Sequence, residues 1–149
     1  MRVLLIFIFM IFSYASNMEI TSKHFEYNQT NNLSLFEGDV NVTKGKDNIL
    51  SDILYVYTSK DRKLDKLIAK GHVKFHVTDK NATYVGNSKV LTYIAPKQLF
   101  IFEGNVHIKK LEDNQQLFGN KVVIDKKNGT ANIVGGKNKP LKFIIKVND

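Results

Sequence analysis

One phrase recurs along the chain at a fixed interval of 33 residues. FEGDVNVTK (36–44) and FEGNVHIKK (102–110) are nearly identical, and IAKGHVKFHV (68–77) between them is a weaker copy. The glycines of the three copies are Gly38, Gly71 and Gly104. Self-similarity at a fixed period is typical of repeat architectures, in which each unit buries its apolar face against the next unit. The chain is therefore expected to fold as a short stack of similar units.

The spacing within each unit decides between helical and β repeats. Apolar residues follow each glycine at every second position, as Val40 and Val42, Val73 and Phe75, and Val106 and Ile108. Alternation with period two indicates a half-buried strand, and no stretch after residue 15 repeats with period 3.6. A second phrase lies between the glycines as TSKHFEY (21–27), SDILYVY (51–57), NSKVLTY (87–93) and GNKVVID (119–125). Its β-branched and aromatic residues are also typical of strands.

Together the two phrases predict an all-β fold. The unit is a strand, a polar turn, a strand through glycine and a second turn, repeated about four times, with IVGGKNKPLKFII (133–145) as a degenerate fourth copy. Each glycine is expected to mark a bulge or bend where a long strand turns a corner. Because a single sheet of this length must curl or fold into two layers, we predict a β-jelly-roll or an open two-sheet sandwich built by stacking the repeats.

The first residues, MRVLLIFIFMIFSYAS, predict a signal peptide over residues 1–15. Arg2 precedes an apolar run of about ten residues, which is shorter than the roughly 20 of a spanning helix, and small residues follow at two-residue spacing. An uncleaved membrane anchor is the alternative. Residues 16–149 are then expected to form a single domain. The chain has no cysteine, so its stability must come from its core, and thiol chemistry is excluded.

Charge and motifs argue against an enzyme. The net charge is +8, and the lysines are spread along the chain. For an exported protein this charge favours anionic lipid headgroups or phosphorylated sugars as partners, and no nucleic-acid partner is expected. A generally solvated lysine-rich surface is the alternative. The four histidines have no carboxylate or cysteine at metal-ligand spacing, so we expect neither a metal site nor a cofactor. No catalytic motif is present, and binding is the remaining function.

The repeated phrases resemble the LptA (OstA-like) family of periplasmic lipopolysaccharide transport proteins. LSLFEGDVNVTKG and LFIFEGNVHIKK, with SDILYVY and GNSKVLTY, carry the resemblance over roughly residues 18–134. It implies a V-shaped β-jelly-roll with an apolar groove. It also implies a periplasmic carrier that stacks head to tail as a homo-oligomer and passes lipopolysaccharide or lipooligosaccharide from an LptC-like inner-membrane protein to an LptD-like outer-membrane protein. IVGGKNKP departs from the pattern, which predicts that the last repeat pairs differently.

Two surfaces are candidates for binding. The inner face of the sheets is expected to hold lipid acyl chains and to comprise Phe25, Tyr27, Val40, Val42, Ile53, Tyr55, Tyr57, Val73, Phe75, Leu91, Tyr93, Val106 and Ile108. The same residues could instead fill a closed core, as in a scaffolding β-repeat protein of the envelope without cargo. An LptC-like anchored protein is a further alternative. The sheet edges are expected to mediate assembly through Met18, Ile20, Phe143, Ile144, Ile145 and Lys146.

Asparagines occur repeatedly in the N-x-[S/T] acceptor pattern for glycosylation. Five do so, at Asn28, Asn32, Asn41, Asn81 and Asn128. In EYNQT, DVNVT and DKNAT an acidic residue also lies two positions before the asparagine, which looks like the extended acceptor of some bacterial glycosylation systems. Chance in a chain rich in asparagine and threonine is the alternative, and the sequence alone favours it.

Overall fold

The computed structural model describes residues 18–79 and 82–147, which form ten β-strands and no helix. The strands are β1 (Met18–Thr21), β2 (His24–Asn28), β3 (Leu33–Lys44), β4 (Asp47–Thr58), β5 (Leu64–Asp79), β6 (Ala82–Ile94), β7 (Leu99–Lys110), β8 (Gln116–Asp125), β9 (Thr130–Val134) and β10 (Lys142–Ile144). The all-β prediction is confirmed. The expected signal peptide lies outside the described residues. Within them, no helix has the length and apolar character needed to cross a membrane.

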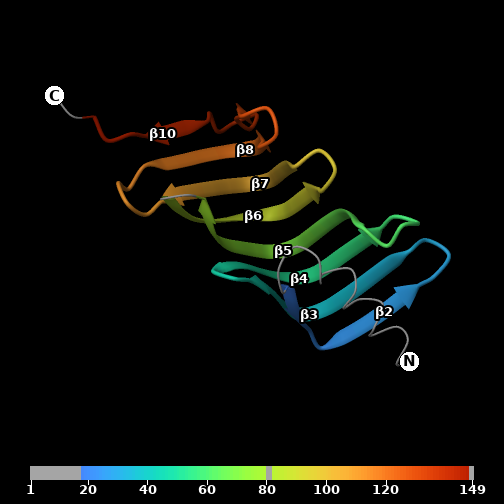
Figure 1. Ribbon diagram of the computed structural model, residues 1–149. Helices are drawn as coiled ribbons and strands as arrows, with labels where there is room; N and C mark the ends of the chain where they lie inside the picture. Colours follow the sequence, from blue (N-terminus) through green and yellow to red (C-terminus); the bar gives the residue numbers. More distant parts are fainter. Residues whose placement is uncertain (1–17, 80–81, 148–149) are drawn as a thin grey trace.

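All neighbouring strands pair antiparallel in one open sheet with the order β1-β3-β4-β5-β6-β7-β8-β10. Two further short strands are not part of this order: β2 pairs with β3, and β9 pairs with β8. Figure 1 shows β2 and β10 at opposite ends of the sheet, so the sheet does not close on itself. Five long strands joined by short turns follow directly from the repeated strand–turn–strand unit.

The three repeat glycines lie at bends in β3, β5 and β7, as the sequence predicts. Gly38, Gly71 and Gly104 have φ between 84° and 86°, and the residue after each has φ between 45° and 49°. The register between neighbouring strands shifts at the same positions, for example between Glu37 and Val40. Only glycine adopts such a φ without steric cost, which explains why these residues recur.

The bends divide the sheet into two layers that share strands. The first layer contains β2, β9 and the segments 33–37, 53–58, 64–70, 90–94, 99–103 and 121–125. The second layer contains β1, β10 and the segments 40–44, 47–50, 73–79, 82–88, 106–110 and 116–119. At each end of the sheet, two short strands take the place of one long bent strand. They are β1 and β2 at one end and β9 and β10 at the other, and each pair is separated at the level of the bends. The degenerate last repeat thus pairs as two separate strands, as expected.

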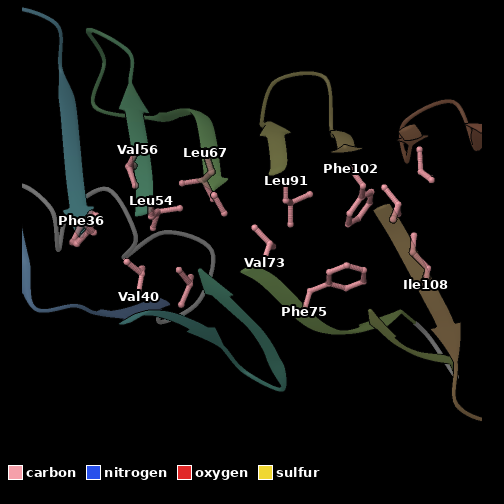
Figure 2. Packing of buried hydrophobic residues seen from close by; sticks show 14 residues of the cluster. Phe36, Val40, Leu54, Val56, Leu67, Val73, Phe75, Leu91, Phe102 and Ile108 are labelled. Carbon is pink, nitrogen blue, oxygen red and sulfur yellow. The ribbon is translucent and has the colours of Figure 1, made fainter. Parts of the chain in front are cut away.

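The core lies between the two layers. Figure 2 shows Leu54, Val56 and Leu67 of the first layer pointing toward Val40 and Val73 of the second. Close to the bends the space is filled: Val40, Val73, Val106 and Val122 are at most 1% exposed. The layers are therefore held together along the line of the bends.

Candidate functional site: an apolar groove between the layers

Away from the bends the two layers leave a groove of about 480 Å³. Its first-layer wall includes Leu54, Leu64, Leu67, Ala69, Leu91, Tyr93, Phe100 and Phe102. Its second-layer wall includes Met18, Val42, Ile49, Phe75 and Val77. The groove thus extends from β1 across to β7, and its volume is within the range of about 300–1,000 Å³ that is usual for ligand sites.

The side chains at the inner end of the groove are buried, and those nearer its rim are partly exposed. Leu54 is 1% exposed and Phe75 5% exposed, whereas Met18, Ile49 and Leu64 are only partly buried. Aromatic rings line the first-layer wall, with the centroids of Tyr93 and Phe100 4.5 Å apart. Burial raises the pKa of the Tyr93 phenol above its usual value. These side chains form an apolar surface that a lipid chain could enter from the rim.

The rim of the groove carries polar groups from both layers. Lys44 of β3 and Lys126, just after β8, are exposed at the rim. Asp47 also lines the groove, and its Oδ1 accepts hydrogen bonds from the backbone N–H and the hydroxyl of Thr78 in β5, at 2.8 and 3.1 Å. The carboxylate is therefore engaged within the protein, while both lysines are exposed to solvent. Cations beside an apolar groove fit an amphiphile with an anionic headgroup.

The two ends of the sheet are the second candidate surface. In the described residues β1 and β2 pair only with β3, and β9 and β10 pair only with β8, so each end has a free edge. Apolar side chains are exposed at the C-terminal end, where Leu141, Phe143, Ile144, Ile145 and Val147 are 39–74% exposed. An exposed apolar edge is a template for strand addition by another chain.

The sequence pattern and this fold agree with a known family. A family model described as LptA/(LptD N-terminal domain) LPS transport protein matches residues 19–133. The chain belongs to this LptA family. It is a family of lipopolysaccharide (LPS) transport proteins rather than of enzymes, and the match confirms the resemblance seen in the sequence.

Solved structures share the fold at low sequence identity. The chain is similar to LptH, described as the LptA homologous periplasmic component of the conserved lipopolysaccharide transport device from Pseudomonas aeruginosa. The TM-score is 0.74 at 12% identity, and the alignment covers 89% of this chain and 96% of LptH. At this identity the likeness establishes the LptA-type fold. No curated protein matches the chain.

The structure places the predicted inner-face residues in three groups. Val42, Phe75, Leu91 and Tyr93 line the groove. Val40, Val73, Val106 and Ile108 lie in the buried core nearer the bends, and Phe25 packs against that core. Tyr27 pairs in register with the buried Ser34, which places it on the same inner face. For these residues the predicted face is right, and a role in lipid binding stays a prediction.

The prediction is wrong for Ile53, Tyr55 and Tyr57, which lie on the outer face of the first layer. Their neighbours Leu54 and Val56 point inward instead, at 1% and 2% exposed. The ring of Tyr57 lies under the Lys66 Nζ at 4.6 Å, and that of Tyr55 under the Lys70 Nζ at 5.4 Å. Since successive residues of a strand point to opposite faces, an error of one residue in alignment inverts the whole strand.

The error comes from aligning the second phrase on its last tyrosine. The structurally equivalent residues are serines at the bends: Ser22, Ser51 and Ser88 each donate a hydroxyl hydrogen bond to the carbonyl two residues later, at 3.0–3.1 Å. Measured from its serine, Tyr93 is five residues on, as is Tyr27, whereas Tyr57 is six residues on. Alignment on the serines would have given the correct face, because the serine is fixed at the bend.

Sequence reasoning also missed part of the groove. Leu67 and Ala69 of β5 and Phe100 and Phe102 of β7 line it, although none was singled out. They lie in the first-layer segments just before Gly71 and Gly104, where the sequence also alternates. The same period-two count, continued to the N-terminal side of each glycine, would have found them.

At the C-terminal edge the strand is shorter than the sequence predicted. Only residues 142–144 pair with β8, with Phe143 opposite Leu117 and Ile144 opposite Gln116. Ile145 and Lys146 lie beyond β10 and are not part of the ladder. At the N-terminal edge Met18 and Ile20 belong to β1 as expected, but Met18 also lines the groove and β2 adds a second edge strand.

Proposed function

We propose that this protein is a periplasmic carrier that holds the acyl chains of LPS or lipooligosaccharide in the groove and passes the molecule between membrane complexes. The observation that carries the proposal is the open apolar groove between the layers, in a chain of the LPS transport family. Removing apolar surface from water stabilises a protein–lipid complex by roughly 25 cal/mol for each Å² that is buried. A lipid with several acyl chains can therefore bind tightly without a specific polar contact.

The lysines at the rim support an anionic amphiphile as the cargo. Lys44 and Lys126 come from different layers, so phosphate groups of a lipid headgroup could contact either side of the groove entrance. Such contacts at an exposed rim are screened by salt and contribute modestly. We therefore assign the affinity to the acyl chains and the orientation of the headgroup to the lysines.

The free edges at opposite ends of the sheet support assembly in a line. Pairing the β9 and β10 end of one copy with the β1 and β2 end of the next is a head-to-tail contact that propagates instead of closing. An LptC-like protein of the inner membrane and an LptD-like protein of the outer membrane would then meet the terminal copies by the same strand addition. The groove of each copy would continue into the next.

Photo-crosslinking tests the cargo site. A crosslinking residue at Tyr93 or Phe100, whose rings face the groove, is expected to capture LPS. The same residue at Thr92 or Ile101, one position along each strand, is expected to give at most a tenth of that yield, because these positions face outward. The measurement is the LPS-linked band on a gel, developed with an antibody to LPS.

The control positions are closely matched. Thr92 and Ile101 are opposite each other on β6 and β7, as Tyr93 and Phe100 are, and all four are partly buried. Equal labelling at all four positions would contradict a groove site. No labelling anywhere, with the protein folded, would favour the envelope scaffold without cargo.

A further inference from the structure

One of the asparagines in an N-x-[S/T] pattern lies in a very different setting from the others. Asn28 is the last residue of β2 and begins the exposed turn to β3, which Figure 1 shows projecting beyond the strand ends. Glu26, two residues earlier, and Thr30, two residues later, are also exposed. In the described residues β2 pairs only with β3, so its other edge is open to an enzyme. Within the acceptor segment EYNQT, the described structure thus leaves every residue except the partly buried Tyr27 exposed.

The turn also fixes the orientation of the Asn28 side chain. The backbone N–H groups of Thr30 and Asn31 donate to Oδ1 of Asn28, at 2.9 and 3.3 Å. Within the described part of the chain, Nδ2 donates to no other residue. The two hydrogen bonds fix the orientation of the carboxamide through its oxygen. The amide nitrogen of the exposed Asn28 is thereby left for a transferase to bind.

The other described asparagines of this pattern do not meet these conditions. Asn41 has an acidic residue two positions before it, but it lies within β3 between β1 and β4, and its Oδ1 accepts from the Nδ2 of Asn48. Asn32 is followed by Ser34, which is 2% exposed. Asn128 has Lys126 instead of an acidic residue, and its Nδ2 donates to Asp125 at 2.9 Å. Asn81 lies outside the described residues.

We infer that Asn28 is an acceptor for an N-linked glycan, transferred by a bacterial oligosaccharyltransferase from a polyprenyl-pyrophosphate-linked oligosaccharide. In this reaction Nδ2 of Asn28 attacks the anomeric carbon, forming a C–N bond. The bond from that carbon to the pyrophosphate oxygen breaks, the lipid pyrophosphate leaves with the electron pair, and one amide proton passes to a base of the transferase. Modification in the cell rests on the proposed periplasmic location.

An assay with purified components tests the inference independently of that location. The folded full chain carrying Asn81→Gln is incubated with a purified bacterial oligosaccharyltransferase and an undecaprenyl-pyrophosphate-linked oligosaccharide. Intact mass is expected to rise by the mass of one oligosaccharide, and glycopeptide mapping is expected to place it on Asn28. Adding Asn28→Gln or Thr30→Val is expected to abolish the gain, and Glu26→Gln to slow it at least tenfold.

Asn41→Gln and Asn128→Gln are the matched controls and are expected to leave the mass gain unchanged. Circular dichroism of each variant shows that it is folded. A gain that persists in Asn28→Gln, or a gain only after the chain is denatured, would overturn the inference. So would no gain at all under conditions in which an unstructured EYNQT peptide is glycosylated.

Discussion

A proline in β10 is expected to abolish association between copies and delivery of LPS while the protein stays folded. Proline has no N–H to donate to a strand ladder, and β10 is an outermost strand of three residues that contributes little to the core. N–H groups of successive strand residues point to opposite edges, so one of Phe143 and Ile144 points its N–H outward and the other toward β8. Phe143→Pro and Ile144→Pro are therefore made separately.

The variant that loses the outward N–H is expected to melt as the unmodified protein does and to sediment as a monomer at all concentrations. Its transfer of LPS to an outer-membrane acceptor complex is expected to fall at least tenfold. Lys146→Pro is the control, because Lys146 lies beyond β10 and should change neither property. If both β10 variants are folded and deliver normally, the C-terminal edge is not the contact between copies.

Gly104→Ala is expected to destabilise the fold by roughly 2–5 kcal/mol. Gly104 has φ of 85°, which a residue with a Cβ adopts only with strain, and its added Cβ would lie 2.7 Å from the Cβ of Lys89. Because Lys89 Cβ is attached directly to the backbone of β6, the neighbouring strand must shift to relieve the contact. Urea unfolding followed by circular dichroism measures the change.

The control for Gly104 is Gly45→Ala. Gly45 also has a positive φ, 60°, but nothing lies within 4 Å of an added Cβ. We expect it to cost about 1–2 kcal/mol, the backbone contribution alone. Equal losses at the two positions would mean that the close approach at the bend costs nothing. Gly38→Ala is expected to resemble Gly104→Ala, since its Cβ would lie 2.9 Å from the Cβ of Lys23.

Much of the architecture could be predicted because it is encoded locally and repeated. Gly38, Gly71 and Gly104 share one backbone conformation, and the alternation after each of them correctly identifies buried residues such as Val40 and Val106. A bend that recurs every 33 residues requires two layers, whatever the details of the turns. Where one copy is ambiguous, as in IAKGHVKFHV, the others determine its interpretation.

The prediction was wrong where a shift of one residue decided which side chains of a strand face the core. In SDILYVY both alternating sets are apolar, with Leu54 and Val56 in one and Ile53, Tyr55 and Tyr57 in the other. Composition alone cannot distinguish the faces of such a strand, and the packing of Leu54 against the core makes the choice. At the C-terminus a continuous alternation predicted a long strand, but β8 offers pairing partners only as far as Gln116, where it begins.

By itself, then, the sequence determined the β-repeat, the bends at its glycines and the family to which the chain belongs, because each depends on a pattern that recurs within one or two strands. The tertiary structure alone decided that the layers are filled near Val73 and open toward Tyr93, that Lys44 and Lys126 border the same groove, and that Asn28 is exposed where Asn41 is not. These properties depend on the distance between segments far apart in the chain. That distance follows from how the two layers pack on each other, which no local period specifies.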